Sequence, residues 1–403
     1  MKILVLAGGS DQIALIQEIK KHGHTVLLAD YFENPPARPY ADKHFPISTL
    51  DIQAVKELAE SENVDLITTA CTDQALLTVA KVSEEIGLPC YISYQTALNV
   101  TNKAYMKKVM IQQNIPTSKY IITDNLNIET TAHLQYPLVV KPVDCNSSKG
   151  VKRVENQEQL STALTDAIHY SRTNTAIVEE FKTGTELSVD CYIENGIAKL
   201  LSVTSSNKIK NTDSFTIIQS YYPAIPSDTE TEILLIAQKI TEAFNLKNTP
   251  LLVQMIYDGK NFFVVEFSAR MGGGSKYKLI EYLSGVDIMK EYVNLVLGNP
   301  VHISPQKKVK YACMNYIYCT PGILYQIKNL DLLKSQADIQ EYFVYKTQGM
   351  KIEKANTSSD RAAGFLITAS NLKDMMNKLQ KANDTIQVLD PQGKDIMKHD
   401  IYL

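Results

Sequence analysis

Y-P-L-V-V-K-P-V-D-C-N-S-S-K-G, residues 136–150, is the stretch of sequence that decides the fold. It begins as an apolar strand that ends in Lys141, where an ammonium group is costly to bury unless an anion meets it. The loop that follows contains Ser147 and Ser148 and closes on Lys149-Gly150. Small side chains let backbone N–H groups converge on phosphate oxygens, and lysines supply positive charge. The stretch therefore indicates a phosphate-binding strand and loop, with a solvated hairpin loop as the alternative.

A second stretch, A-I-V-E-E-F-K-T-G-T-E-L at residues 176–187, places carboxylates beside a tight turn. A buried strand ends at Glu179 and Glu180, the chain turns at a glycine, and Glu186 leads into the next strand. Backbone groups around Phe181 are suited to an adenine ring, and Glu186 is suited to accept two ribose hydroxyls. Because acid pairs at strand ends are often only solvated, this stretch is weak evidence by itself.

The third stretch, residues 251–274, contains Asp258-Gly259 between two apolar runs, which is a strong hairpin signal. Gln254 and Glu266 can then face one another, provided that a bulge or a longer loop adjusts the register. Two oxygen ligands facing a phosphate suit Mg²⁺, which prefers carboxylate, carbonyl, water and phosphate oxygens. Arg270 can neutralise charge that develops in phosphoryl transfer, and the glycine triplet after it lets the backbone approach a ligand closely.

The first hundred residues alternate apolar strands with helical patterns, which predicts a parallel sheet covered on both faces. The turn at Gly8-Gly9 is similar to the start of a dinucleotide fingerprint, with Asp30 placed for a ribose. However, the third glycine is missing, and Asp11 puts a negative charge where a pyrophosphate would lie. A tight turn between strand and helix is therefore favoured over a nicotinamide site.

Periodicity and turn signals predict the remaining elements, and after residue 120 the pattern changes to strands with β-branched residues. We expect helices at 11–22, 51–62, 73–86, 103–113, 157–170, 228–245 and 371–382. We expect strands at 2–7, 25–29, 65–69, 89–92, 137–141, 151–154, 176–181, 187–193, 251–257, 262–267, 309–318 and 363–369.

Composition excludes several classes of protein. The chain has 403 residues, with 41 Lys+Arg against 44 Asp+Glu, so it lacks the basic excess on which nucleic-acid binding depends. No window approaches the roughly 20 apolar residues of a membrane helix. The six cysteines show no C-x-x-C spacing, which predicts reduced thiols rather than a disulfide framework or a zinc site. We expect a cytoplasmic protein without nucleic-acid or membrane partners.

Taken in order, these stretches resemble the ATP-grasp superfamily. The resemblance rests on Asn102-Lys103 at a helix start, the strand ending in Lys141, the loop 144–150, the run E-E-F-x-x-G-x-E and the hairpin ending at Arg270. It is similar in pattern to carbamoyl-phosphate-synthase-like, amino-acid ligase and phosphoribosylglycinamide-synthetase-like ligases. The resemblance implies a Rossmann-like parallel-sheet domain at 1–101 and a two-subdomain ATP-grasp fold at 102–300, with a lid at about 118–185. A C-terminal α+β segment at 301–403 packs on that core.

The resemblance also implies roles for individual residues. Lys141 and Arg270 are the implied catalytic residues. The implied nucleotide contacts are Lys103 and Lys141 on phosphates, Ser147, Ser148 and Gly150 in the lid loop, Glu179 and Phe181 at the adenine, and Glu186 at the ribose. The implied metal ligands are Gln254, Glu266 and Ser268. The cofactors are then ATP and Mg²⁺, with Mn²⁺ as an alternative metal. Ser268 stands where the family usually has Asn, which leaves the number of metal ions open.

The implied activity is ATP-dependent ligation of a small-molecule carboxylate to an amine through an acyl phosphate. The alternatives are a phosphoribosylglycinamide-synthetase-like enzyme, a bicarbonate-using carboxylase or carbamoyl-phosphate-type enzyme, and a nucleotide-binding regulator without catalysis. A substrate carboxylate is expected to bind Arg270 and Lys276, and Asp73 is expected to hold an amino group. The alternative is that residues 276–278 only begin a helix. Residues 208–213 read as a polar loop that lines the pocket, and a homodimer is expected because family members are often dimers.

Overall fold

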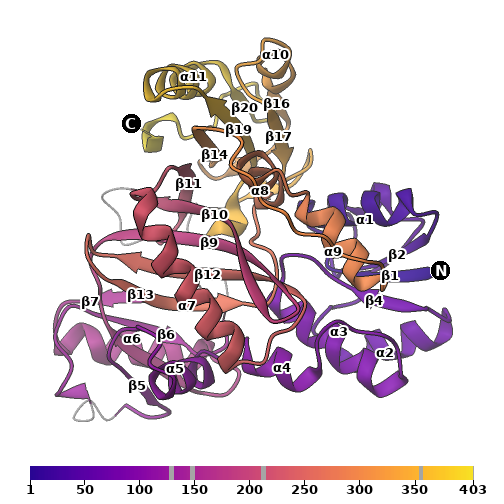
Figure 1. Ribbon diagram of the computed structural model, residues 1–403. Coiled ribbons are helices and arrows are strands. Elements are labelled where there is room, and N and C mark those ends of the chain that lie inside the picture. Colours follow the sequence, from indigo (N-terminus) through magenta and orange to yellow (C-terminus); the bar gives the residue numbers. More distant parts are fainter. Residues whose placement is uncertain (127–130, 146–149, 210–214, 354–356, 403) are drawn as a thin grey trace.

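The computed structural model describes residues 1–126, 131–145, 150–209, 215–353 and 357–402 (Figure 1). The predicted class, α/β followed by α+β, is confirmed, because a parallel sheet precedes sheets that are antiparallel. The limits of the three parts at residues 101 and 300 stay a prediction.

The N-terminal part is built on a parallel sheet with the strand order β3-β2-β1-β4. Strand β1 pairs in parallel with β2 on one side and β4 on the other, because each helical connection returns the chain to the same end of the sheet. The strands are β1 (Lys2–Leu6), β2 (Thr25–Ala29), β3 (Lys43–Phe45) and β4 (Leu66–Thr68). The helices are α1 (Ser10–Lys21), the 3-10 turn η1 (Arg38–Tyr40), α2 (Ile52–Ser61), α3 (Asp73–Ile86) and α4 (Tyr94–Asn99).

The strand predicted at 89–92 is wrong, and the two edge strands of this sheet are β3 and β4. Pro89 has no N–H to donate to a strand ladder. The segment instead runs toward the hairpin, where the Tyr91 hydroxyl donates to the Ala269 carbonyl at 3.2 Å. Strand β3 escaped the sequence analysis because its three residues begin with a lysine and a histidine and form no apolar run.

An antiparallel sheet with the order β13-β12-β9-β10-β11-β14-β19-β17 forms the centre of the molecule (Figure 1). Strands β10 and β11 were not predicted, because β10 is rich in serine and threonine and lacks a clean apolar alternation. The strands are β9 (Thr185–Glu194), β10 (Ile197–Lys208), β11 (Ile217–Tyr222), β12 (Thr249–Tyr257), β13 (Phe262–Ser268), β14 (Tyr311–Ile317), β17 (Glu341–Val344) and β19 (Ala363–Ala369).

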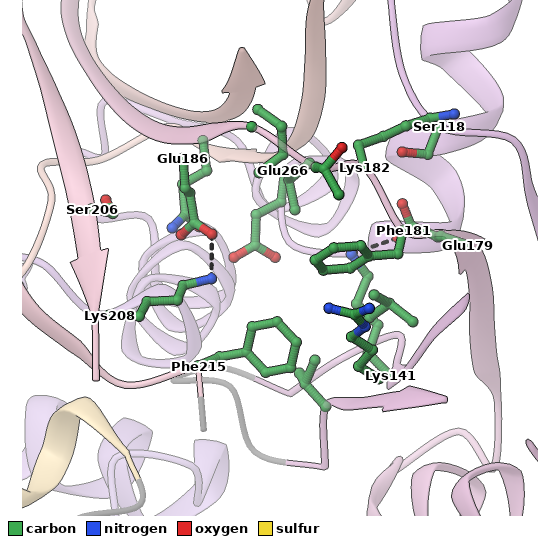
Figure 2. A pocket seen from close by; sticks show the side chains of 18 of the residues that line it. Ser118, Lys141, Glu179, Phe181, Lys182, Glu186, Ser206, Lys208, Phe215 and Glu266 are labelled. Atoms are coloured by element: carbon green, nitrogen blue, oxygen red, sulfur yellow. Dashed lines mark hydrogen bonds and ion pairs between the residues drawn. The ribbon is translucent and has the colours of Figure 1, made fainter. Parts of the chain in front are cut away.

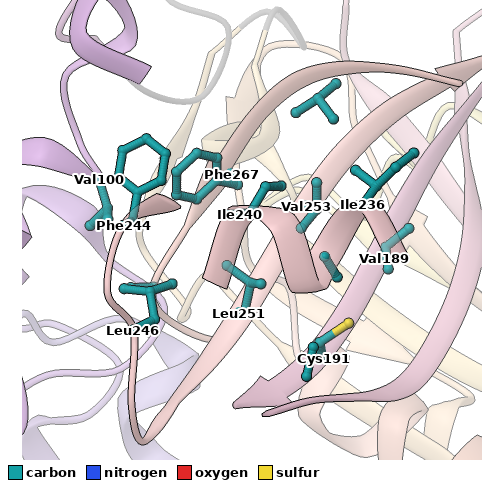
Figure 3. Close-up of a cluster of buried hydrophobic side chains, with 14 of the residues drawn as sticks. Val100, Val189, Cys191, Ile236, Ile240, Phe244, Leu246, Leu251, Val253 and Phe267 are labelled. Atoms are coloured by element: carbon teal, nitrogen blue, oxygen red, sulfur yellow. The ribbon is translucent and has the colours of Figure 1, made fainter. Parts of the chain in front are cut away.

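One face of this sheet is covered by α7 (Glu230–Ala243), which follows the 3-10 turn η3 (Ser227–Thr229). Ile236 and Ile240 of the helix belong to one apolar cluster with Val189 and Val253 of the strands (Figure 3). Since side chains alternate across a strand, burial of Val253 on the helix side turns Gln254 to the opposite face. Packing of the core thus decides which face of the hairpin is free for a ligand.

A smaller antiparallel sheet with the order β5-β8-β6-β7 forms a separate lobe, which we call the lid sheet. Its strands are β5 (Tyr120–Thr123), β6 (Leu138–Pro142), β7 (Lys152–Val154) and β8 (Ala176–Glu180). The amphipathic helix α6 (Gln157–Tyr170) covers one face through Leu160 and Leu164. Helix α5 (Lys103–Gln112) leads into the lid sheet.

The remaining elements complete the C-terminal part and join it to the rest. Helices α8 (Lys276–Ser284) and α9 (Ile288–Val296) follow the hairpin, and α9 packs beside α1 through Ile288 and Tyr292 (Figure 1). The others are β15 (Gly322–Ile323), β16 (Gln326–Lys328), α10 (Leu330–Ser335), β18 (Lys351–Ile352), η4 (Ser358–Asp360), α11 (Leu372–Thr385), β20 (Gln387–Leu389) and η5 (His399–Tyr402). Across the described ranges, no helix combines the length and the apolar character needed to cross a bilayer.

Candidate nucleotide site

A cavity of about 700 Å³ opens between the lid sheet and the central sheet (Figure 2). The β6 strand and the β8–β9 connection form one wall, and the β12–β13 hairpin forms another. The lining includes most of the described residues that the sequence analysis selected for a nucleotide: Lys103, Lys141, Glu179, Phe181, Glu186, Gln254 and Glu266. Segments more than 150 residues apart in sequence therefore meet at one site.

Lys141 lies at the cavity wall, at the end of strand β6, and is nearly buried. Its ammonium group is 2.5 Å from Glu179 Oε1 on the neighbouring strand β8. The other oxygen of Glu179 lies 2.7 Å from Lys107 Nζ in helix α5. Burial alone would raise the pKa of Glu179, but Lys107 and Lys141 outweigh it and lower that pKa to about 2. Glu179 is thus a fixed anion between two cations, and its predicted place at an adenine stays a prediction.

Lys103 begins helix α5 and lies next to the hairpin. Its Nζ donates to the Cys145 carbonyl at 2.8 Å and forms an ion pair with Glu266 at 3.1 Å. Burial would raise the pKa of Glu266, but Lys103 and Lys141 outweigh that effect and lower it. Lys103 and Glu266 therefore neutralise each other in this structure. The sequence analysis instead expects a phosphate on Lys103 and a metal ion on Glu266.

The hairpin brings Gln254 and Glu266 together in the way that the turn sequence predicts. They are direct cross-strand partners, and the register shifts between Gln254 and Met255, which is the expected bulge. Ser268 is two residues further along β13, outside the residues that line the cavity. Its side chain hydrogen-bonds the buried Asp73 carboxylate instead.

The oxygen donors at the hairpin fit a hard divalent cation in part. Glu266 supplies a carboxylate that is a third exposed, and Gln254 supplies an amide oxygen beside it. Within the described ranges, no group of three or more His, Cys, Asp or Glu residues gathers in a metal-binding arrangement. A cation here would therefore need oxygens from a bound phosphate and water to complete its coordination.

The far end of the cavity carries aromatic rings and a second ion pair. Glu186 bonds to Lys208, whose Nζ lies 4.6 Å from the centre of the Phe215 ring. Phe181 is stacked under the Arg153 guanidinium at 4.4 Å. Figure 2 shows the rings of Phe181 and Phe215 between Lys141 on one side and Lys208 on the other. Flat rings beside a carboxylate are a suitable surface for a base and its ribose.

A second cluster of charges surrounds the glycine triplet 272–274, and we call it the glycine-loop corner. Its members are Asp11, Asp73, Asp190, Arg270, Lys276 and Arg361. Arg270 binds the Asp73 carboxylate with two nitrogens, Nε at 2.6 Å and Nη2 at 2.5 Å. Burial would raise the pKa of Asp73, but this arginine outweighs it and holds the pKa below its usual range. The acid expected to hold a substrate amine is therefore paired with Arg270.

Two more ion and hydrogen-bond contacts order this corner. Lys276 lies 3.4 Å from Asp190 and donates to the Thr204 hydroxyl at 3.1 Å, deep beneath the glycines. Burial lowers the pKa of Lys276 despite that carboxylate. Asp11 accepts the backbone N–H groups of Gly274 and Ser275 at 3.0 and 2.7 Å. The carboxylate that argues against a dinucleotide turn thus binds the start of helix α8.

Arg361 reaches the same corner from the C-terminal part. Its guanidinium lies 3.6 Å from the centre of the Tyr316 ring, and its Nε donates to the Tyr318 hydroxyl at 3.2 Å. Among the described residues it forms no ion pair. A methyl group on Gly274 would lie 2.3 Å from its Nη1, and Gly274 has a φ of 75°, so only glycine fits there.

Several selected residues lie outside the described ranges or off the cavity wall. Ser147, Ser148 and Lys149 fall in the undescribed residues 146–149, and most of the predicted loop 208–213 falls in 210–214. Gly150 is described, with a φ of 73°, and a side chain there would meet Pro142 and Tyr170. Arg270 is not among the cavity-lining residues and belongs to the glycine-loop corner. The roles assigned to the individual site residues stay predictions.

Sequence analysis missed functional candidates that only the fold brings to these two sites. Lys107 lies in the helix that begins at Asn102-Lys103, but the sequence analysis gave it no role, and Arg153 lies on a short polar strand. Lys208 begins the predicted polar loop 208–213, but its ion pair with Glu186 was not predicted. Arg361 stands two residues before the apolar strand β19, in the same way as many surface arginines. Of these residues, only Lys107 could have been found from the sequence. It lies on the same helix face as the apolar Met106 and Met110, and a lysine on a buried face needs a partner of opposite charge.

Comparison with known proteins agrees with this arrangement. Residues 134–278 match the sequence model of the ATP-grasp domain. A formate-dependent phosphoribosylglycinamide formyltransferase from Actinobacillus pleuropneumoniae serotype 3 is 27% identical over 164 residues. That match covers 40% of this chain and 42% of the relative, so the chain spans less than half the length of that curated protein.

Two solved structures share the fold over nearly the whole chain. An L-amino acid ligase from Bacillus licheniformis has a TM-score of 0.81 and 19% identity, covering 96% of this chain and 98% of its own. The biotin carboxylase domain of the Hydrogenobacter thermophilus 2-oxoglutarate carboxylase, a dimer complexed with MgADP, ADP and bicarbonate, has a TM-score of 0.79 and 16% identity. It covers 96% of this chain and 90% of its own. Family match, fold and cavity agree: the chain contains an ATP-grasp domain.

Proposed function

We propose that the protein is an ATP-dependent ligase that joins a small-molecule carboxylate to an amine, with ADP and phosphate as products. The observation that carries the proposal is the placement of two nearly buried lysines, Lys103 and Lys141, opposite the Gln254–Glu266 pair in one cavity. Buried ammonium groups beside oxygen donors form a site for a polyphosphate and its cation. The resemblance to ATP-grasp ligases supports the same assignment.

The chemistry follows from where the charges lie. A carboxylate oxygen of the substrate attacks the γ-phosphorus of ATP, the bond to the β-phosphate oxygen breaks, and ADP leaves. The amine nitrogen then attacks the acyl carbon, the bond to phosphate oxygen breaks, and the amine proton passes to solvent or phosphate. Lys141 and Lys103 hold the phosphates and offset their charge, and Arg270 stabilises charge that develops during transfer. The lid sheet shields the acyl phosphate from water.

The hairpin supplies two of the oxygen ligands that a magnesium ion would need as a cofactor. Glu266 and Gln254 would hold it, with Lys103 released from Glu266 to bind phosphate. When bound, the ion supplies positive charge to the phosphoryl oxygens. Ser268 stays a predicted ligand, although its side chain contacts Asp73 in this structure.

The acceptor substrates are assigned to the glycine-loop corner. Arg361 is the candidate partner for a substrate anion, because its guanidinium is nine-tenths buried and has no ion-pair partner in the described part of the chain. Arg270 belongs to this corner and stands two residues after the end of the hairpin strand β13, so it can face both the acceptor and the reacting phosphate. A homodimer and a cytoplasmic location remain part of the proposal.

The test measures phosphate released from MgATP in the presence of each of the twenty amino acids, singly and in pairs. Release that needs one acid or one pair, together with an amide product in the mass spectrum, is the expected result. Release that needs bicarbonate alone would replace the proposal with a carboxylase-type activity. Binding of MgATP without turnover on any of these, or on sugar-phosphate amines, would contradict the ligase assignment and favour a regulator.

A further inference from the structure

Lys107 is a buried cation that belongs to none of the sequence motifs. It lies in the middle of helix α5 with 1% of its surface exposed. Its Nζ lies 2.7 Å from Glu179 of the lid sheet and 3.3 Å from the Val264 carbonyl of the hairpin. It also donates to the Thr117 hydroxyl, which in turn donates to the same Val264 carbonyl at 2.7 Å. One ammonium group thus joins the lid sheet, the segment before it and the central sheet.

The charges around Lys107 do not balance by themselves. Glu179 is shared by Lys107 and Lys141, so two buried cations face one carboxylate. Of the two cations, only Lys141 lines the nucleotide cavity, and Lys107 lies behind Glu179. The excess positive charge is therefore available at the cavity wall. Without Lys107, the carboxylate of Glu179 would be matched by Lys141 alone, and this pair would carry no excess charge for a phosphate.

We propose that Lys107 is a positioning residue for the nucleotide site. It holds the Glu179 carboxylate from behind, so that Lys141 keeps its charge for a nucleotide phosphate. Its bonds to Thr117 and Val264 fix the lid sheet against the hairpin at the edge of the cavity. This inference rests on the proposed function, because it requires that the cavity bind ATP.

The competing account is that Lys107 only stabilises the fold. The two accounts differ in whether the charge of Lys107 affects the affinity for nucleotide. If Lys107 only stabilises the fold, its loss lowers the melting temperature and leaves the affinity for nucleotide unchanged. If it sets the charge behind Lys141, its loss weakens nucleotide binding, and removing the charge of Glu179 as well restores it. The second change leaves Lys141 again without a carboxylate that cancels it.

The experiment measures the dissociation constant of MgATP by calorimetry, with thermal melting as a check of folding. We expect Lys107→Met to weaken binding about tenfold, in the range of coupled charged pairs. The double variant Lys107→Met/Glu179→Gln should bind more tightly than Lys107→Met, and Lys107→Arg should stay close to the wild type. Lys108→Met is the matched control, since Lys108 is exposed on the same helix and should behave as the wild type.

Three results would overturn the inference. One is a folded Lys107→Met variant with wild-type affinity, and another is a double variant as weak as the single one. If Lys107→Met does not fold, Lys107→Gln replaces it, because an amide still donates hydrogen bonds but carries no charge. The third result is then equal affinity of Lys107→Gln and Lys107→Arg for MgATP. Failure of the wild type itself to bind MgATP would contradict the proposed function, and the inference would fall with it.

Discussion

The nucleotide cavity and the glycine-loop corner are both rich in charge, but they are assembled differently. In the cavity, cations and carboxylates come from stretches with a recognisable order, and the Lys141–Glu179–Lys107 group keeps one excess positive charge. In the corner, Arg270 and Lys276 each have a carboxylate partner, while Arg361 has none among the described residues. The comparison indicates that the cavity is prepared for a polyanion, whereas the corner offers a smaller anion one arginine, Arg361, that forms no ion pair within the described ranges.

The largest effect is expected at the cavity. Lys141→Met removes the cation that faces the phosphates and should lower kcat/KM for ATP about 100- to 1000-fold, the range seen when one transition-state donor is lost. Steady-state kinetics of phosphate release would measure it. The comparison breaks if the variant keeps a KM for ATP and a kcat near those of the wild type while it remains folded.

A substitution of Arg270 is expected to change the affinity for MgATP little and to lower kcat strongly. Arg270→Lys retains charge but cannot bind Asp73 with two nitrogens. We expect kcat to fall about 100-fold with little change in the affinity for MgATP, because this side chain acts outside the cavity. A change confined to the ATP dissociation constant would instead place Arg270 functionally in the cavity.

The corner alone is tested at Arg361. Arg361→Gln should raise the KM for the acceptor carboxylate about tenfold, which corresponds to the loss of one charge-assisted hydrogen bond. The KM for ATP should stay within about twofold of the wild type, because Arg361 does not line the nucleotide cavity. Glutamine preserves part of the contact with Tyr316, so loss of folding is not expected to confuse the result. An unchanged acceptor KM would remove Arg361 from the acceptor site.

The smallest effect concerns pH and stability. The pKa of Glu179 is about 2 in the folded protein, below its usual value of 4.5. A lowered pKa contributes stability that is present above pH 4.5 and is lost as the pH falls toward 2. The free energy of unfolding should therefore decline less steeply over that range in Glu179→Gln than in the wild type. Denaturant titrations at several pH values would show this, and Glu353→Gln, at an exposed ion pair, serves as the control that keeps the wild-type slope.

The cavity could be predicted well from the sequence because its residues lie on short, ordered stretches. Counting residues around the Asp258-Gly259 turn showed that Gln254 can face Glu266 only with a bulge or a longer loop, and the structure has a register shift between Gln254 and Met255. The corner could not, because Asp11, Asp190 and Arg361 come from segments about 170 residues or more apart, and only tertiary packing brings them together. The edge strand β3 was missed for a local reason, since three residues without an apolar pattern carry no strand signal.

The sequence analysis also did not predict which charged residues pair with each other. It selected Asp73, Lys276 and Glu179 as groups that face a ligand, whereas the structure pairs each with an opposite charge. Burial explains the difference, because a charge removed from water requires a compensating group whether or not a ligand is bound. A sequence shows which residues carry charge, but the pairing of those charges depends on the fold.

The central claim is that a substrate carboxylate is phosphorylated by ATP in this cavity, and the direct test is transfer of oxygen. The carboxylate identified in the phosphate-release screen is labelled with ¹⁸O at both oxygens and incubated with MgATP and its amine, and the released phosphate is analysed by mass spectrometry. An acyl phosphate predicts that each phosphate released carries one ¹⁸O atom from the carboxylate. Unlabelled phosphate released in step with amide product would contradict the account.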